Sequence, residues 1–331
     1  MKGIVGRGRA ARTRLAAVGA LCAALLPAGT VQADTGPAGT AAATATTTYT
    51  VWQWNVAGQK INGGSAGTGM VEGAVASIVG RNADFAAFNE LCGNQWRALV
   101  AQLRAAGWPA DSANFGRFEP SRQANSGVCG GEEFGNAIFS KRPLGTADRI
   151  QLPDDGTAEK RNMLCAPLQA DPGTRFCTTH ITVASDADKL AQLAAVQGKL
   201  DTWVKAGQRV VLAGDLNVQP HYRSLDTFYS ATLKTTVNGN NSGLFREVDD
   251  NDPANCPGYG EWTADDPTVS PSPCGTPRKI DMIFVSESAL AAPDSYSGDS
   301  LAISTACDRT TASPDGRCSD HRILVGTATL K

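Results

Sequence analysis

The sequence predicts one large α/β domain, because apolar segments with strand periodicity alternate with segments that have helix periodicity. Two further observations support this fold class. The alternation runs from residue 49 to residue 331 without an internal repeat, which argues against a repeat architecture. Six of the apolar segments begin or end in a polar side chain, as expected where strands meet a functional edge of a sheet. We therefore treat residues 49–331 as one domain.

The first 33 residues have the composition of a secretory signal peptide. Five basic residues between Lys2 and Arg14 precede an apolar run at 15–26, and small residues at 31–33 form a cleavage site. The apolar run is too short to cross a bilayer, which disfavours the alternative of an uncleaved membrane anchor. Cys22 has no lipobox around it, so a lipoprotein is not expected. We predict cleavage after Ala33 and a secreted, extracellular protein.

The chain that remains after cleavage is acidic. Residues 1–33 hold five of the 30 Lys and Arg and none of the 32 Asp and Glu, which leaves a net charge of −7. This charge argues against a broad basic surface that clamps nucleic acid, although a bound cation could supply a local positive field for a polyanion. Residues 34–48 are small and rich in Thr and Ala, which predicts a disordered leader.

Eight cysteines remain once Cys22 is removed, and an even number in an exported protein predicts four disulfides. Sequence alone allows about 105 connectivities, of which the pairing of nearest neighbours is the simplest. The 165–177 pair is the best supported, because its flanks have the pattern of a hairpin. No CxxC spacing occurs, so a zinc site is not expected. The four pairs would be Cys92–Cys129, Cys165–Cys177, Cys256–Cys274 and Cys307–Cys318.

The individual elements follow from the spacing of apolar residues. Pro- and Gly-rich stretches at 251–278 and 292–318 predict long surface loops, each closed by its own cysteine pair. Whether these loops are functional or plain insertions stays open. Strand patterns occur at 49–56, 85–89, 136–140, 162–168, 175–182, 210–213, 281–285 and 323–329, and helix patterns at 69–81, 95–106 and 187–206.

Two of the three histidines lie in polar clusters at the ends of apolar segments. His180 follows the strand that begins at 175, and His321 precedes the strand at 323–329. One such histidine alone is commonly a surface residue, which is also our expectation for His221. For His180 and His321 we expect a functional role instead, because other apolar segments also end in amides and carboxylates. All of these side chains would converge on one edge of a sheet. These polar residues are Asn55, Glu90, Asp215, Asn217 and Asp281.

The ordered set of motifs resembles the endonuclease/exonuclease/phosphatase superfamily. That superfamily includes pancreatic-type deoxyribonucleases, abasic-site endonucleases, neutral sphingomyelinases, the catalytic subunit of cytolethal distending toxin and inositol polyphosphate phosphatases. The resemblance covers residues 50–330, and its strength comes from order, spacing and strand context together. The motifs are Trp54-Asn55-Val56, Asn89-Glu90, GNAIFS at 135–140, Thr179-His180, GDLN at 214–217, Lys279-Ile280-Asp281 and Ser319-Asp320-His321.

The resemblance implies a four-layer α/β/β/α sandwich, in which two packed mixed sheets are flanked by helices and the site lies at one end. It also implies a divalent cation, Mg²⁺ or alternatively Mn²⁺ or Ca²⁺. Glu90 would be its main protein ligand, and Asn55 and Asp320 would assist directly or through water. Oxygen ligands suit such a hard cation, and the sequence offers no Cys and His cluster that would favour a softer one.

A hydrolytic mechanism also follows from the resemblance. Asp281 would hydrogen-bond His321, and the pair would activate or orient the attacking water. Asp215 and Asn217 would position the nucleophile and contact the scissile phosphate, because side chains two apart on an extended segment point the same way. His180 would lie across the phosphate from His321, where it would donate to an oxygen or assist the leaving group.

Two further positions match the family less cleanly. Arg161 resembles a family arginine that grips a phosphate. In the deoxyribonuclease branch a glutamate pairs with the first catalytic histidine and lies just upstream of the segment matching 136–140. Glu132 and Glu133 are near that position but out of register, and Asn136 could instead contact the phosphate or His180.

The leading hypothesis for the substrate is a nucleic acid. A secreted, monomeric nuclease that cleaves DNA or RNA phosphodiesters fits export and disulfides, and it would use local cations instead of a broad basic surface. A binding module that has lost activity is disfavoured, because every expected catalytic position is filled. The candidate phosphate-binding cations are Arg117, Arg122, Lys141, Arg142, Arg161, Arg223, Arg278 and Lys279.

A phospholipase C-type enzyme such as a sphingomyelinase, or a phosphomonoesterase for a small molecule, is the alternative. A lipid-cleaving member should expose an aromatic hairpin to the membrane interface. Trp262 is the obvious candidate, and the acidic Asp265 and Asp266 that follow it would resist an anionic surface. We therefore expect no stable membrane association.

Overall fold

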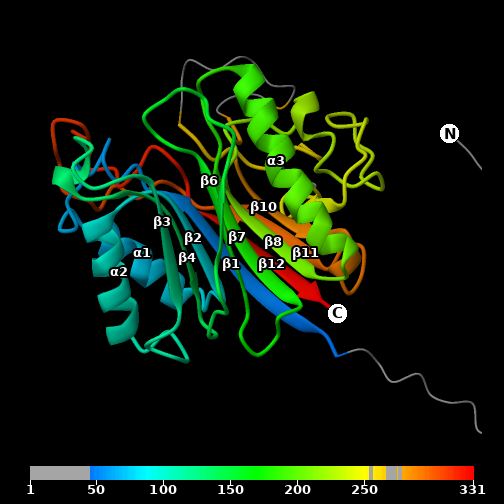
Figure 1. Cartoon of the computed structure of the whole chain (residues 1–331), viewed down its shortest axis with the longest axis horizontal. Coiled ribbons are helices and arrows are strands. Elements are labelled where there is room, and N and C mark those ends of the chain that lie inside the picture. The colour runs from blue at the N-terminus through cyan, green and yellow to red at the C-terminus, as the bar shows by residue number, and fades with distance from the viewer. Residues whose placement is uncertain (1–44, 253–255, 266–273, 275–277) are drawn as a thin grey trace, which may run out of the picture. The chain divides into compact units, whose positions relative to one another are not determined.

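Two six-stranded mixed sheets form the centre of the computed structural model, which describes residues 45–252, 256–265, 274 and 278–331 (Figure 1). The predicted signal peptide and most of the predicted leader at 34–48 lie outside the described residues. The first strand begins at Thr47, two residues earlier than the sequence pattern indicated. None of the helices within the described ranges is long and apolar enough to span a membrane.

The first sheet has the strand order β11-β12-β1-β2-β4-β3. Strands β1 and β2 pair in parallel, and the other neighbours are antiparallel. A parallel pair in register brings the carboxyl ends of β1 and β2 to the same edge. The strands are β1 (Thr47–Asn55), β2 (Phe85–Cys92), β3 (Gly116–Arg122), β4 (Phe134–Ser140), β11 (Tyr296–Ser300) and β12 (Leu324–Leu330).

The second sheet has the order β5-β6-β7-β8-β10-β9 and repeats this arrangement, with β7 and β8 as its parallel pair. Its other neighbours are antiparallel. The strands are β5 (Asp148–Gln151), β6 (Asn162–Pro167), β7 (Thr174–His180), β8 (Arg209–Asp215), β9 (Phe245–Glu247) and β10 (Asp281–Ser286).

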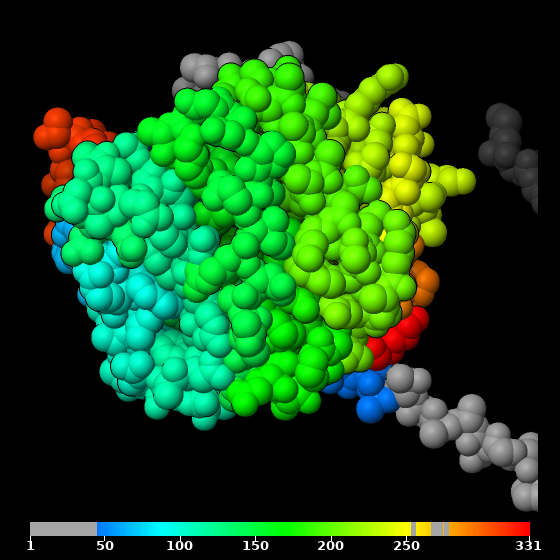
Figure 2. Space-filling model, viewed as in Figure 1, coloured from blue at the N-terminus to red at the C-terminus, as the bar shows by residue number. Residues whose placement is uncertain are grey.

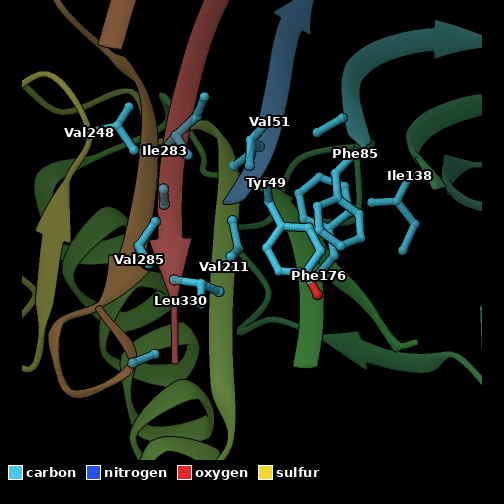
Figure 3. Packing of buried hydrophobic residues seen from close by; sticks show 14 of the residues in the cluster. Tyr49, Val51, Phe85, Ile138, Phe176, Val211, Val248, Ile283, Val285 and Leu330 are labelled. Carbon is cyan, nitrogen blue, oxygen red and sulfur yellow. The ribbon is translucent and has the colours of Figure 1, made fainter. Parts of the chain in front are cut away.

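The inner faces of the two sheets share one apolar core. Phe85 of the first sheet stacks on Phe176 of the second, with ring centroids 4.7 Å apart, and Tyr49 stacks on Phe85 at 5.3 Å (Figure 3). Val211 and Ile283 extend the same cluster from the second sheet. Burial of these large side chains is the main stabilising term for the sandwich.

Helices cover the outer faces of both sheets. Helices α1 (Met70–Gly80) and α2 (Gly93–Ala105) pack on the first sheet, and α3 (Asp186–Lys205) packs on the second. Ser185 caps the N-terminus of helix α3, because its Oγ accepts a hydrogen bond from the backbone N–H of Asp188. Side chains fill the space between the ribbons on the face seen in Figure 2. The four-layer α/β/β/α sandwich is therefore confirmed.

The remaining helical segments are single 3₁₀ turns in the loops. They are η1 (Cys129–Gly131), η2 (Arg223–Leu225) and η3 (Glu287–Ala289). The nearest-neighbour disulfide hypothesis agrees with the structure, which joins Cys92 to Cys129, Cys165 to Cys177, Cys256 to Cys274 and Cys307 to Cys318.

Four strands escaped sequence analysis, namely β3, β5, β9 and β11, and these four are the edge strands of the two sheets. An edge strand pairs on one side only, is short or polar, and lacks the apolar run of a strand buried on both faces. Strand β11 lies inside the stretch at 292–318 that was predicted to be a surface loop, so that prediction was wrong for Tyr296–Ser300.

Replacing Phe176 with Ala is expected to lower the free energy of unfolding by about 3–5 kcal/mol, because the ring is buried between the sheets. Chemical denaturation measures this change. Val79→Ala is the control, since Val79 is exposed on α1 and its loss should cost under about 0.5 kcal/mol. Equal effects of the two substitutions would contradict the described core.

Candidate active site

Strand register brings three of the predicted catalytic residues side by side at one edge of the second sheet. His180 at the end of β7 lies opposite Asp215 at the end of parallel β8. Asp215 lies opposite Asp281, the first residue of antiparallel β10. In the first sheet Asn55 at the end of β1 lies opposite Asn89 of β2. The predicted convergence of polar strand ends is therefore present in the structure.

These strand ends surround a cavity of about 540 Å³. Seven predicted site residues line it, whereas Asn55 and Asp281 lie buried behind its wall. A volume of this size is typical of sites for small molecules or for one segment of a polymer. The lining residues are Lys60, Glu90, Glu159, Arg161, His180, Val183, Asp215, Asn217, Ala264, Asp265, Arg278, Ile280, Asp320 and His321.

His321 and Asp281 form a direct pair. The Nδ1 atom of His321 lies 2.8 Å from Oδ2 of Asp281, so this nitrogen carries the proton that the carboxylate accepts. Burial lowers the pKa of His321, but the charge and hydrogen bond of Asp281, assisted by Asp215 and Asp320, outweigh burial and raise that pKa to about 10. The pair leaves the Nε2 atom of His321 on the cavity side.

Asp215 occupies the centre of the site. Its Oδ2 atom lies 3.6 Å from Nε2 of His180 and 3.8 Å from Nε2 of His321, and it accepts a hydrogen bond from Nδ2 of Asn55 at 3.0 Å. Burial, followed by the negative charge of Asp281, raises the pKa of Asp215 to about 7. Both imidazoles therefore face the same carboxylate oxygen.

His180 has a hydrogen-bond partner at Nε2, and a carboxylate lies near its Nδ1 atom. Nδ2 of Asn217 donates to the carbonyl of Ile181 at 2.9 Å and lies 3.2 Å from Nε2 of His180. In the neutral ring Nε2 therefore accepts and the proton lies on Nδ1, which faces Oε1 of Glu159 at 3.6 Å. Burial, followed by the charges of Arg161 and His321, lowers the pKa of His180 well below its ordinary value.

The acidic neighbour of His180 is Glu159, which sequence analysis did not single out. Oε1 of Glu159 also lies 2.8 Å from Nη1 of Arg161 and accepts from Oγ of Ser121 at 3.3 Å. Burial raises the pKa of Glu159, and the negative charge of Glu90 acts in the same direction. Glu132, one of the two glutamates considered for this position, instead forms a partly exposed ion pair with Arg97.

Glu90 reaches the cavity from an irregular part of β2. The pairing of β2 with β4 shifts between Phe88 and Leu91, and Glu90 has a φ of 56°. A bulge with positive φ in a residue other than glycine is strained and is found mainly at functional sites. Nδ2 of Asn55 donates to Oε1 of Glu90 at 3.1 Å, which fixes the carboxylate.

Two of the predicted metal ligands are already engaged. Oδ1 of Asn55 accepts from the backbone N–H of Ala57 at 3.1 Å, so its amide supports Glu90 and Asp215 and does not turn an oxygen toward the cavity. Asp320 lines the cavity and forms an ion pair with the exposed Lys60 at 2.6 Å. Burial raises the pKa of Asp320, but His321 and Lys60 outweigh it and lower that pKa.

A second group of side chains also has the proximity that a metal ion requires. One ligand atom from each of Asp215, Asp281 and His321 lies within 4.8 Å of the other two. Two of these three residues, His321 and Asp281, are already hydrogen-bonded to each other. A metal ion bound by all three would have to replace that hydrogen bond. Glu90, which accepts an amide hydrogen bond from Asn55, and Asp320, whose ion-pair partner Lys60 is exposed, are the cavity carboxylates that could turn to an oxygen-ligated cation.

Asn136 does not line the cavity and is 2% exposed. Its Oδ1 accepts from Asn89 at 2.9 Å and its Nδ2 donates to Asn162 at 2.9 Å, so both amide atoms are bonded within the protein. The predicted substrate contact of Asn136 is thus not supported by this geometry. The same holds for Lys279, which is fully buried between Asp249 and Glu247 at 3.1 and 3.3 Å.

Arg161 and Arg278 are the two predicted phosphate-binding cations that line the cavity, joined there by Lys60. Lys60, Glu159 and Asp265 lie in loops without a recognisable motif, which is why sequence analysis missed them. His221, expected on the surface, is half-buried and stacks on Tyr259 at 5.9 Å.

Comparison with known proteins identifies the family and the fold. The model of the Endonuclease/Exonuclease/phosphatase family matches residues 52–321. Among curated proteins, none matches the sequence. The fold is similar to that of humanized D. rerio TDP2, with 19% identity, a TM-score of 0.55 and coverage of 86% of this chain and 99% of that one.

Two further solved structures share the fold. The human Nocturnin catalytic domain with a bound sulfate anion has 16% identity and a TM-score of 0.56, and the match covers 86% of this chain and 95% of that one. An endonuclease/exonuclease/phosphatase from Beutenbergia cavernae has 22% identity and a TM-score of 0.55, with coverage of 86% and 72%. At these identities the likeness shows the fold alone.

The pKa values of the two site histidines are expected to be shifted in opposite directions from that of an ordinary imidazole, upward for His321 and downward for His180. In metal-free protein the ring of His321 should stay protonated through neutral pH and lose its proton near pH 10, whereas His180 should stay neutral to well below pH 6.5. NMR of ¹⁵N-labelled histidine measures both, with assignments from His180→Gln and His321→Gln. Loss of the His321 proton near its ordinary pKa of about 6.5 would contradict the described pair.

Proposed function

The chain belongs to the endonuclease/exonuclease/phosphatase family, and from this premise we propose that it is a divalent-metal-dependent nuclease that hydrolyses DNA or RNA phosphodiester bonds outside the cell. One observation supports the proposal above the others. Two imidazoles face a single carboxylate oxygen of Asp215 from 3.6 and 3.8 Å inside one cavity. A phosphate bound there would have a histidine within reach of both its attacking and its leaving oxygen.

The charge of the cavity supports a metal-dependent reaction. Five carboxylates line it, against the three cations Lys60, Arg161 and Arg278 and the imidazolium of His321. A phosphate anion that enters beside these carboxylates would be stabilised by a bound cation, which would also offset their negative charge. The site residues fit Mg²⁺, Mn²⁺ or Ca²⁺, because Glu90 and Asp320 offer hard oxygen atoms.

We assign the metal to Glu90, with Asp320 as second carboxylate and Asn55 as the residue that positions Glu90. A cation held there supplies positive charge that neutralises a phosphate oxygen and counters the carboxylates that raise the pKa of His321. Asp215, Asp281 and His321 remain available for proton transfer, because the hydrogen bond between the last two stays intact.

The protein groups then divide the hydrolysis between them. The Nε2 atom of His321 takes the proton of the attacking water, and Asp281 stabilises the imidazolium that results. Asp215 and Asn217 orient the water and the phosphate. His180 and Arg161 lie on the other side of Asp215, where they hold a phosphate oxygen and the leaving group, with Glu159 fixing both side chains.

Extracellular action is supported by the four disulfides and by the predicted signal peptide. The lipid-cleaving alternative loses its main support in the structure. Trp262, the candidate for an exposed membrane-binding aromatic, is only partly exposed, and the guanidinium of Arg322 lies 3.3 Å from its ring centroid. A partly buried Trp with an arginine on its ring is poorly suited to enter a membrane interface.

The purified protein is expected to nick plasmid DNA or degrade RNA with Mg²⁺ or Mn²⁺ and to stop when EDTA is added. Glu90→Gln and His321→Gln should each reduce the rate by about 10²–10⁴-fold, because they remove a metal ligand and a general base. Gel assays on both nucleic acids measure the rates. Release of choline phosphate from sphingomyelin without nuclease activity would replace the proposal with a phospholipase C-type reaction.

Glu159→Gln is expected to lower kcat by about 10- to 100-fold with little change in KM, because the amide no longer stabilises a protonated His180. Glu132→Gln is the matched control, since Glu132 was the other candidate partner and lies in a partly exposed ion pair. The pH profile of kcat should shift for Glu159→Gln alone. Equal effects of both substitutions would remove Glu159 from the proposed mechanism.

A further inference from the structure

A second polar cavity lies beside the catalytic one. It has a volume of about 420 Å³, and we call it the flanking cavity. Its walls come from the end of β3, the loop after it, the end of β5 and the segment before β6. The lining residues are Glu119, Pro120, Ser121, Arg122, Gln123, Ser126, Gln151, Ala158 and Lys160.

A single short segment, residues 158–161, separates the two cavities. Glu159 and Arg161 line the catalytic cavity, whereas the alternate residues Ala158 and Lys160 line the flanking cavity. The segment is a bend followed by irregular backbone, and its successive residues contribute to opposite cavities. The backbone N–H of Lys160 donates to the carbonyl of Ser121 at 2.8 Å, which holds the segment against the end of β3.

Two residues of the flanking-cavity wall have buried hydrogen-bond donors without acceptors. In the described part of the chain, neither Nε of Arg122 nor Oγ of Ser126 has a partner, although both atoms are buried. The guanidinium of Arg122 is tethered by a bond from Nη2 to the carbonyl of Ser126 at 2.8 Å. Buried donors without acceptors are costly, so a side-chain movement that turned these donors to an acceptor in the cavity would be favourable.

The charge of the flanking cavity selects an anion. The carboxylate of Glu119 is neutralised by an ion pair with Arg149, and no carboxylate among the described residues pairs with Arg122. Lys160 has a 2.7 Å ion pair with Asp154, but both side chains are about half-exposed or more, and such pairs contribute little. Lys160 can therefore turn to an anionic ligand at small cost.

We propose that the flanking cavity binds the phosphate of the nucleotide next to the scissile bond, through Arg122, Ser126 and Lys160. This inference rests on the proposed nuclease function and adds to it a preference for polymeric substrates. A chain that places one phosphate beside His180 and Arg161 reaches the flanking cavity by crossing residues 158–161. A small monoester or a substrate with a single phosphate would leave this cavity unused.

The test compares a 12-nucleotide oligonucleotide with bis(p-nitrophenyl) phosphate, which carries one phosphate. Arg122→Gln and Lys160→Ala should lower kcat/KM for the oligonucleotide by about tenfold, because each removes a charge-assisted contact. Each substitution should also reduce, by about one, the magnitude of the slope in a plot of the logarithm of the oligonucleotide-binding constant against the logarithm of the salt concentration. Neither substitution should change kcat/KM for the small ester.

Lys205→Ala is the matched control, since Lys205 is also an exposed lysine with one surface ion pair, at 3.2 Å to Asp201. Arg122→Lys, which keeps the charge, should recover part of the oligonucleotide rate. Equal losses on both substrates, or no loss on the oligonucleotide, would overturn the proposal while leaving the nuclease function intact.

Binding of a fluorescent oligonucleotide by protein that carries His321→Gln, followed by anisotropy, decides the question with little turnover. The His321→Gln protein should bind, and adding Lys160→Ala should weaken binding more than adding Lys205→Ala. Failure of the wild-type protein to cleave either substrate in any divalent metal would overturn the proposed nuclease function. If it also failed to bind the oligonucleotide at low salt, the flanking cavity would not be a nucleotide site.

Discussion

A buried amide contact between the two sheets fixes the geometry on which the site depends. Oδ1 of Asn89 accepts from Nε2 of Gln53 within the first sheet and from the backbone N–H of Asp215 in the second. Nε2 of Gln53 also donates to Oδ1 of Asp281 at 3.1 Å. All of these groups are buried, so each bond forms where an unpaired polar atom would be costly. The apolar core brings the sheets together, and these amides set which strand ends face each other.

This arrangement also explains how like charges are kept close together. Asp215 and Asp281 lie on neighbouring strands, and burial alone would favour their neutral forms. The amides of Asn55 and Gln53 and the imidazolium of His321 offset that repulsion. The site therefore combines these carboxylates with the basic side chains of Lys60, Arg161 and Arg278 in one cavity.

Sequence analysis predicted the central strands and the residues at their ends, because both follow from local patterns. Val210 to Ala213 is an apolar run, and Asp215 must come to the edge once that run is a central strand. The edge strands and Glu159 have no such pattern. Glu159 reaches His180 from a loop, by a tertiary contact that no spacing along the chain encodes. Lys279 was a candidate phosphate contact because it is basic and lies near Asp281 in the sequence. Its complete burial, which no local pattern indicates, excludes that contact.

The position of Glu159 ties the chemistry of the site to its shape. A carboxylate supplied from a neighbouring strand would hold His180 independently of the loops. Here the carboxylate lies on the segment that separates the two cavities, between a residue that faces one and a residue that faces the other. The hydrogen bond from the Lys160 N–H to the carbonyl of Ser121 holds this backbone in place, so the Lys160 side chain can turn to a ligand while Glu159 stays beside His180. The chemistry of the catalytic cavity and the wall of the flanking cavity therefore depend on one loop segment.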